Sequence, residues 1–325
     1  MADTLDGTRD ALKEAVTRAA ATFSERVLQA PSVAAVELAH AEFLGSRAVV
    51  CARASAGDLE TFRGLTKAAR RGLVAFYETC GTARHALARP LGYPGDYTIL
   101  ELAYDVRPHA DSRTAAGRFA DAWFAGAPLA RAVSARKDLL ASMFEERALS
   151  AGRPVRILSL AAGAARELRE MSPRALQFVE STLVDRDPRP LDFARVCLGG
   201  VAPEHRVRTV VGDVIAGGAV VDEVATGGPF DVIYSFGLFD YLDDAQMLTT
   251  VRNFLPLLAD GGQVVFCLKD RRHYDWLPAD WLYNWQFVPR TADDGLRLAG
   301  ELGLRVAKTW LVGDRCIAVW ACERR

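Results

Sequence analysis

Two aspartates follow apolar segments that are typical of neighbouring strands, at the end where parallel sheets bind their ligands. Asp185 ends the segment "STLVD", and Asp213 follows the segment "VRTVVG". Asp185 lies about 20 residues beyond Gly163, which is the separation at which a carboxylate on the second strand of a βαβ unit binds ribose hydroxyls. These residue types predict a site for adenosine, with Asp185 at the sugar diol and Asp213 at the exocyclic amine.

The stretch "ILSLAAGAAREL" (157–168) predicts a strand, a turn of small residues and a helix. A dinucleotide site needs several glycines at such a turn, because the backbone has to approach a bulky, charged pyrophosphate. This turn has only Gly163, with alanine at 161, 164 and 165. S-adenosylmethionine (SAM) carries no phosphate, so the turn favours SAM over a nicotinamide dinucleotide. The alternative is a structural corner between strand and helix.

The candidate cofactor site comprises residues at the ends of the first four predicted strands. Arg136, on the helix before the first strand, is a further candidate because a guanidinium can bind the methionyl carboxylate with two parallel hydrogen bonds. The alternative for Arg136, as for Arg131, is a solvated helix surface. The candidates in this half of the chain are Ser159, Ala161, Gly163, Asp185, Arg186, Gly212, Asp213, Val214, Ser235, Phe236 and Gly237.

Methyl transfer from a sulfonium is an in-line displacement, for which a protein has to align the reactants and exclude water. A carboxylate acceptor needs little acid–base chemistry, whereas an amine or hydroxyl acceptor needs a base. The catalytic candidates are Asp240 and Tyr241 after the fourth strand and Tyr97 on a covering segment. His273, on a second covering segment, is also considered. The alternative role of Asp240 is to cap the helix that begins near Asp243.

The segment "GYPGDY" (92–97) contains Tyr93, Asp96 and Tyr97 on a stiff frame of proline and glycine. We expect it to form a lid over SAM, with a tyrosine ring facing the sulfonium in a cation–π contact of about 1–2 kcal/mol. The alternative is a rigid turn between two helices. The later segment "HYDWLPADWLYNW" (273–285) places Trp281 and Trp285 on one helical face, either as the wall of an apolar substrate pocket or as plain packing.

Hydrophobic periodicity separates the chain into two parts. Residues 1–150 predict an α-helical N-terminal domain, and Leu12, Val16, Phe23 and Val27 share one face of its first helix. Residues 151–325 alternate strand-like with helical runs, which predicts a mostly parallel sheet covered on both faces. The turn "VGD" (312–314) is too short for a crossover, so one of the last two strands runs antiparallel.

The predicted fold is therefore an α/β, Rossmann-like sheet of seven strands with an antiparallel last hairpin, preceded by the helical domain. The predicted strands are 155–160, 181–185, 207–211, 230–235, 263–268, 304–311 and 315–321, and the predicted helices among them lie near 165–178, 188–198, 243–259 and 291–302.

Composition excludes several classes of protein. A formal net charge of -1 over 325 residues argues against a nucleic-acid binder or a membrane-surface protein and favours a small-molecule substrate. We expect no secretory signal and no spanning helix, because the N-terminus and the remaining chain lack the required apolar runs. Six cysteines without CxxC spacing indicate reduced thiols and a cytoplasmic location, and five histidines without ligand spacing argue against a metal. A homodimer is one of the oligomeric states that the sequence allows.

The motifs "SLAAGAARE", "LVDRDP" and "FDVIYSFGLFDYLDD", with "RPLGYPGDY" upstream, resemble the class I SAM-dependent methyltransferases. The similarity is closest to a bacterial branch that has a helical N-terminal extension and includes enzymes proposed to make 3-hydroxy fatty acid methyl esters. The first motif departs from the family's acidic residue and GxGxG, since Ser159, Ala161 and Ala165 stand at three of those positions. The resemblance implies the class I methyltransferase fold and SAM as the cofactor.

Three functions remain open from the sequence. The first is a SAM-dependent methyltransferase acting on a small, partly apolar metabolite with a carboxyl, hydroxyl or amine acceptor, in secondary metabolism or signalling. The second is an intramolecular cyclase that forms azetidine-2-carboxylate and methylthioadenosine from SAM, because azetidine-2-carboxylate synthases have a similar framework. The third is a non-catalytic module with the same fold.

Overall fold

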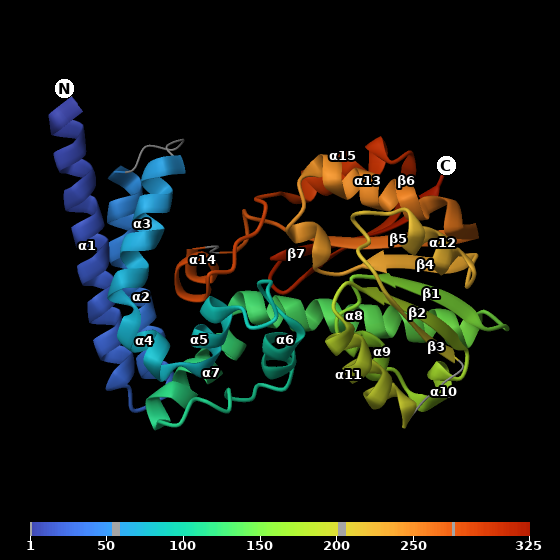
Figure 1. Cartoon of the computed structure of the whole chain (residues 1–325), viewed down its shortest axis with the longest axis horizontal. Helices are drawn as coiled ribbons and strands as arrows, with labels where there is room; N and C mark the ends of the chain where they lie inside the picture. Colours follow the sequence, from blue (N-terminus) through green and yellow to red (C-terminus); the bar gives the residue numbers. More distant parts are fainter. Residues whose placement is uncertain (1, 54–58, 201–205, 275–276) are drawn as a thin grey trace. The chain divides into compact units, whose positions relative to one another are not determined.

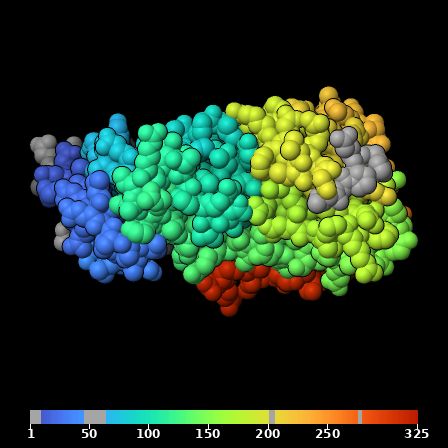
Figure 2. Space-filling model, turned by 90° about the horizontal axis from the view of Figure 1, so that it is seen from below, coloured from blue at the N-terminus to red at the C-terminus, as the bar shows by residue number. Residues whose placement is uncertain are grey.

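The computed structural model describes residues 2–53, 59–200, 206–274 and 277–325. The chain forms two compact units (Figure 1). The helical unit comprises Met1–Ala130 and Asp275–Gln286, and the sheet unit comprises Arg131–Tyr274 and Phe287–Arg325. Figure 2 shows the molecular surface in the same sequence colours, from blue at the N-terminus to red at the C-terminus.

The helical unit packs its helices around one apolar core. The buried face of the first helix is confirmed, because Leu12, Val16, Phe23 and Val27 are all buried in that core. A Cβ atom on Gly72 would lie only 2.3 Å from the carbonyl oxygen of Thr17, so the absence of a side chain lets these two segments touch. The helices of this unit are α1 (Ala2–Leu28), α2 (Val33–Arg53), α3 (Leu59–Gly72), α4 (Val74–Thr79), α5 (Gly81–Ala88), α6 (Tyr97–Tyr104), α7 (Ala115–Gly126) and α14 (Leu277–Tyr283).

The sheet unit contains one seven-stranded sheet in the order β3-β2-β1-β4-β5-β7-β6. Strands β1 to β5 pair in parallel, and β7 is antiparallel to both β5 and β6. The predicted fold class is therefore confirmed, including the antiparallel last hairpin. The strands are β1 (Val155–Leu160), β2 (Val179–Asp185), β3 (Val207–Val211), β4 (Phe230–Ser235), β5 (Leu258–Lys269), β6 (Leu304–Val312) and β7 (Ile317–Arg324).

Helices cover both faces of this sheet, with α8, α9 and α11 on one face and α13 and α15 on the other (Figure 1). The strand order reverses between β1 and β4, so the crevice at their carboxyl ends is where a ligand is expected. The helical elements here are α8 (Pro128–Ser150), α9 (Arg166–Arg169), α10 (Pro173–Leu176), α11 (Pro188–Gly199), α12 (Ala219–Ala225), η2 (Leu238–Asp240), α13 (Asp244–Phe254), η3 (Leu255–Leu257) and α15 (Ala292–Glu301).

Local chemistry explains where the element bounds differ from the prediction. The expected helix near 165–178 is two short helices, because Ser172 and Pro173 start α10 and the Ser172 hydroxyl accepts a hydrogen bond from Ala175 N. The last strand starts at Ile317, since Asp314 and Arg315 form the preceding turn with φ angles of 54° and 68°. The helix α12 was not predicted.

The division between the two units also differs from the predicted boundary at residue 150. Most of α8 belongs to the sheet unit, where Phe144 packs on Tyr234 with ring centroids 4.9 Å apart. Residues 275–286 belong to the helical unit, where Trp281 is buried and its carbonyl oxygen accepts a hydrogen bond from the Tyr77 hydroxyl at 3.0 Å. Each segment belongs to the unit against which its apolar side chains are buried. Helical periodicity shows that a face is apolar, but it does not show which surface covers that face.

Candidate functional site

The turn after β1 has a backbone suited to glycine even where the sequence has alanine. Ala161, Gly163 and Ala165 have φ angles of 57°, 53° and 46°. This left-handed region is strained for alanine by about 1–2 kcal/mol, because Cβ approaches the following carbonyl oxygen. The turn after β1 thus has a glycine-type backbone although alanine occupies two of its three left-handed positions.

We expect Ala161→Gly to stabilise the sheet unit by about 0.5–1 kcal/mol in urea unfolding. Removing the left-handed strain outweighs the extra backbone entropy that glycine gives the unfolded chain. Ala164 has no positive φ, so the matched variant Ala164→Gly is expected to lose about 0.5–1 kcal/mol. Equal destabilisation by the two variants would contradict the interpretation.

Asp185 lies at the carboxyl end of β2 and joins the first two strand ends. One carboxylate oxygen accepts a hydrogen bond from Gly163 N at 2.9 Å, and the other accepts one from Asp187 N at 3.0 Å. The side chain is only 8% exposed, and burial raises its pKa although these two hydrogen bonds oppose the rise. A carboxylate has about four lone-pair sites, so Asp185 can still accept from two hydroxyl groups.

Asp213 lies beyond the neighbouring strand, β3, and is exposed. Its carboxylate accepts a hydrogen bond from Ile215 N at 2.9 Å, which holds the side chain in a local turn. The ends of β2 and β3 are joined by the hydrogen bond from Gly212 N to the Asp185 carbonyl oxygen at 2.9 Å. The structure thus brings the two predicted carboxylates to adjacent strand ends. Val214, which follows Asp213 and was also a candidate, is buried in the core of the sheet unit.

The end of β4 completes this edge of the sheet. The Ser235 hydroxyl donates to the carbonyl oxygen of Leu160 at 2.8 Å, so it ties β4 to β1 and is not directed at solvent. Gly237 has a φ of 131°, a conformation that side chains disfavour. The ring of Phe236 lies 5.6 Å from the guanidinium of Arg136. Arg186, the remaining candidate next to these strand ends, is exposed.

Arg136 is buried, so the alternative of a solvated helix surface is wrong for this residue. It donates to the Cys267 sulfur at 3.6 Å. Burial raises the pKa of Glu167, and the charge of Arg136 partly offsets that rise. Arg131, in contrast, is exposed and lies 3.7 Å from the Asp314 carboxylate. Arg136 is therefore the arginine of α8 that can contribute a charge to the interior of this unit.

The sequence interpretation missed Glu167, a carboxylate on α9 next to the candidate site. The Tyr234 hydroxyl donates to its carboxylate at 2.5 Å, and Ser159 hydrogen-bonds to the same tyrosine. Burial raises the pKa of Glu167, and the hydrogen bond from Tyr234 partly offsets this rise. Its position directly after the small-residue turn is the signal that could have identified it.

Asp240 forms a buried ion pair with Lys269, which the sequence interpretation also missed. The Lys269 ammonium and its backbone N–H both donate to the carboxylate, and the ammonium lies 4.0 Å from the ring centroid of Phe287. Burial lowers the pKa of Lys269, and the charge of Asp240 opposes this. The alternative that Asp240 caps the next helix is wrong, because Asp243 caps α13. The Tyr241 ring packs on Phe287 with centroids 5.7 Å apart.

Tyr93, Asp96 and Tyr97 lie in the helical unit, whereas His273 lies in the sheet unit. Asp96 is buried and caps α6, accepting hydrogen bonds from Thr98 N and Ile99 N, so its carboxylate has a structural function. Gly95 packs against the indole of Trp285, which fixes the turn. Tyr93 and Tyr97 flank this region, and their contact with SAM stays a prediction.

The described ranges contain no group of three or more histidine, cysteine, aspartate or glutamate side chains arranged to hold a metal ion. Nor does any helix within them have both the length and the apolar character needed to cross a membrane. The cysteines at 80, 197, 267, 316 and 322 are free thiols. Residues 275–276 of the predicted substrate-covering segment lie outside the described residues.

No protein-family model and no curated protein sequence matches this chain significantly. Among solved structures, one described as a possible exported protein from Bordetella parapertussis is similar over 97% of this chain and 96% of its own, with a TM-score of 0.59 and 18% identity. Magnesium protoporphyrin IX methyltransferase (ChlM) from Synechocystis PCC 6803, solved with SAH, matches 61% of this chain and 87% of its own, with a TM-score of 0.47 and 9% identity. The glycopeptide N-methyltransferase MtfA, solved with SAM, matches 57% and 94%, with a TM-score of 0.42 and 16% identity. At these identities, the likeness to the Bordetella protein shows a shared fold along nearly all of both chains.

Proposed function

We propose that this chain is a SAM-dependent methyltransferase that acts on a small, partly apolar metabolite, in secondary metabolism or signalling. The observation that supports it most is the carboxylate of Asp185, which is held by two backbone N–H groups at the switch-point edge of a class I methyltransferase sheet. That arrangement leaves acceptor positions for the two hydroxyls of a ribose.

The residues at this edge fit SAM better than a dinucleotide. Asp185 would hold the ribose diol, and the exposed carboxylate of Asp213 would accept from the adenine amine. The backbone of the turn at 161–165 can lie against the edge of the ribose. The alanine side chains at two of its left-handed positions, however, oppose the close approach of a pyrophosphate. When bound, SAM supplies an activated methyl group.

The buried ion pair of Asp240 with Lys269 favours an acceptor that needs no base. Proton uptake by this carboxylate would leave the ammonium of Lys269 buried without its partner charge, which makes the pair a poor general base. Of the three acceptor types, a carboxylate is already nucleophilic at neutral pH. We therefore propose a carboxyl acceptor first, and hydroxyl and amine acceptors after it.

A cytoplasmic location and the absence of nucleic-acid and membrane partners belong to the same proposal. The free thiols support the first, and the nearly balanced charge of the chain supports the second. A homodimer is compatible with this proposal.

The deciding experiment incubates the full chain with SAM alone and then with SAM and small-molecule extracts, and identifies the adenosyl product by mass spectrometry. We expect S-adenosylhomocysteine only when an acceptor is present. Methylthioadenosine formed without an acceptor would instead establish the intramolecular cyclase. If calorimetry detects no SAM binding near millimolar concentration, the third function, a non-catalytic module, becomes the better proposal.

A further inference from the structure

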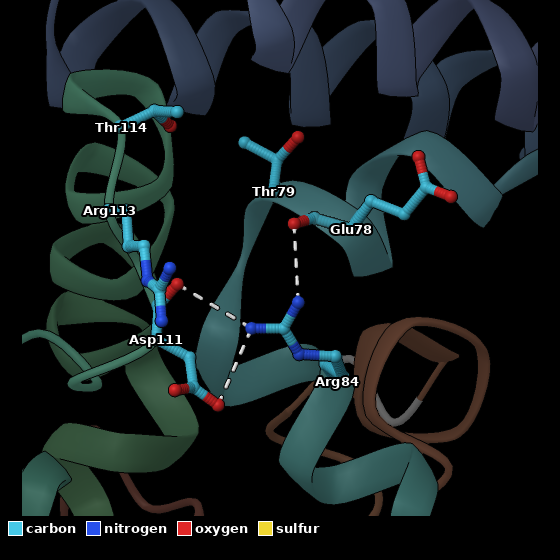
Figure 3. A pocket seen from close by; sticks show the side chains of 6 residues that line it. All are labelled: Glu78, Thr79, Arg84, Asp111, Arg113 and Thr114. Carbon is cyan, nitrogen blue, oxygen red and sulfur yellow. Dashed lines mark hydrogen bonds and ion pairs between the residues drawn. The ribbon is translucent and has the colours of Figure 1, made fainter.

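The helical unit has an open cavity of about 390 Å³ with charged walls (Figure 3). The cavity is lined by Glu78, Thr79, Arg84, Asp111, Arg113 and Thr114. The ion pair of Arg84 with Asp111 in this cavity is exposed, and solvent screening makes such charges weak ligands. In the sheet unit, by contrast, Arg136 is buried and Glu167 is half-buried, so their charges can act on a ligand more strongly.

Glu167 lies beside the ends of β1 and β4. It is in the first turn of α9, directly after the small-residue turn, and its carboxylate accepts a hydrogen bond from the Tyr234 hydroxyl at 2.5 Å. Ser159 and Tyr234 are register partners in the parallel pair of β1 and β4, and the Ser159 side chain hydrogen-bonds to the same hydroxyl. The Tyr234 hydroxyl and the backbone N–H of Glu167 use two of about four lone-pair sites on this carboxylate. Glu167 can therefore accept hydrogen bonds from a ligand.

Arg136 approaches the end of β4 from the direction of β5. It donates to the sulfur of Cys267, which belongs to the neighbouring strand β5. Its guanidinium lies 5.6 Å from the ring centroid of Phe236, the first residue beyond β4. The ring centroids of Phe236 and Tyr234 are 6.1 Å apart. A carboxylate on the side of β1 and a guanidinium on the side of β5 thus flank the end of β4.

The negative charge of Glu167 is only partly compensated by its neighbours. Burial raises the pKa of this carboxyl, and the hydrogen bond from Tyr234 and the charge of Arg136 offset the rise only in part. A cation bound at Glu167 would complete the compensation. Because Glu167 is half-buried, a ligand at the end of β4 can still reach it.

The amino-acid end of SAM carries an ammonium and a carboxylate on the same carbon atom. In the proposed site, Asp185 and Asp213 bind the nucleoside and leave both of these charges without a partner. The carboxylate of Glu167 is complementary to the ammonium, and the guanidinium of Arg136 is complementary to the carboxylate. The reverse orientation would bring like charges together at both positions.

We propose that Glu167 is a specificity-determining residue that binds the ammonium group of SAM, while Arg136 binds the carboxylate of the same amino-acid end. This inference rests on the proposed function, because it takes SAM as the ligand. Glu167 supplies, from the helix after the turn, a negative charge that Ser159 at the end of β1 does not carry. Tyr234 is a positioning residue, since it acts through its hydrogen bond to Glu167.

Three thioethers that share one nucleoside separate the two contacts of the amino-acid end. S-adenosylhomocysteine has both the ammonium and the carboxylate, its decarboxylated form keeps only the ammonium, and methylthioadenosine has neither. None of them carries the sulfonium charge, so attraction between Glu167 and a positive sulfur does not enter the comparison.

The test is isothermal titration calorimetry of the full chain with each thioether, for the wild type and for Glu167→Gln. The variant keeps an acceptor oxygen for the Tyr234 hydroxyl but removes the charge. We expect at least about a tenfold loss of affinity for S-adenosylhomocysteine and for its decarboxylated form, as for one charge-assisted hydrogen bond, and a change within about twofold for methylthioadenosine. Glu146→Gln, which removes an exposed carboxylate from α8, is the matched control and should bind all three ligands as the wild type does.

The wild type provides a measurement that needs no variant. Decarboxylated S-adenosylhomocysteine should bind at least about tenfold more tightly than methylthioadenosine, because only the former has an ammonium for Glu167. Equal affinity of these two ligands would overturn the role of Glu167.

The outcomes distinguish this inference from the proposed function. If none of the three thioethers binds, the nucleoside site is absent, and the proposed function fails together with the inference. If methylthioadenosine binds and Glu167→Gln keeps the wild-type preference for S-adenosylhomocysteine, the nucleoside site stands and the role of Glu167 is overturned. An equal loss of affinity for all three ligands in Glu167→Gln would also overturn that role, because the residue would then support the site as a whole.

Discussion

Asp185→Asn is expected to weaken SAM binding at least about 100-fold. The variant removes the charge that strengthens two hydrogen bonds to the ribose diol, each about 1.5–3 kcal/mol when one partner is ionised. A loss of about 3 kcal/mol corresponds to this factor in the dissociation constant. Isothermal titration calorimetry with SAM measures the effect directly.

The control for this variant is Asp192→Asn. Asp192 is an exposed carboxylate on α11 that lies 3.3 Å from Arg195, so it should keep wild-type affinity. Because Asp185 also accepts from two backbone N–H groups, thermal unfolding of both variants has to show that the fold is intact. Should Asp185→Asn perturb the fold, Asp213→Asn provides an independent variant, with an expected loss of about tenfold for one charge-assisted hydrogen bond. Wild-type affinity in a folded Asp185→Asn variant would contradict the proposed nucleoside site.

Lys269→Met is expected to destabilise the sheet unit by about 3–5 kcal/mol. The substitution leaves the carboxylate of Asp240 buried without its counter-charge, which is costly because a charge in the protein interior has lost the solvation of water. Asp240 is 2% exposed, so water cannot replace the missing ammonium without local opening. Urea unfolding followed by circular dichroism provides the free energy of unfolding.

A double variant separates the charge pair from simple packing. Asp240→Leu combined with Lys269→Met removes both charges, and it should recover most of the stability that Lys269→Met loses. Lys308→Met on the exposed face of β6 is the matched control. It removes only an exposed cation–π contact with Trp310 and should stay within about 1 kcal/mol of the wild type. If the double variant is as unstable as Lys269→Met alone, the cost comes from lost packing around the lysine stem.

The two stability experiments also bear on the proposed chemistry. A large cost for an isolated Asp240 carboxylate would mean that the pair resists the loss of either charge, which is consistent with an acceptor that needs no base. A small cost would mean that Asp240 can change its charge readily, and an amine or hydroxyl acceptor would then become the better proposal.

The seven strands, their mostly parallel pairing and the antiparallel last hairpin were predictable from the sequence, because hydrophobic periodicity and crossover length are local properties. The order of the strands within the sheet was not predicted. The position of Asp185 at the end of the second strand was predictable for the same reason, since its separation from the small-residue turn is fixed by the length of one βαβ unit. The predicted pair of strand ends is also confirmed, as Asp185 and Asp213 follow neighbouring strands. Their contact with SAM stays a prediction.

Partners that lie far apart along the chain were not predictable. Glu167, which follows β1, meets Tyr234 because β1 and β4 are neighbours in the sheet. Asp240 meets Lys269 because β4 and β5 are neighbours. The role of Arg136 was left open for a related reason, since the periodicity of α8 does not show which face the sheet covers.

The sequence by itself determined the seven-stranded sheet, its antiparallel end and the carboxylate at the end of its second strand, because spacing along the chain sets all three. Only the tertiary structure decided that α8 belongs to the sheet unit, that 275–286 belongs to the helical unit, and which carboxylate has a buried cation beside it. The physical reason is that burial and charge pairing depend on which surfaces meet, and a pattern of residue types specifies a surface without specifying its partner.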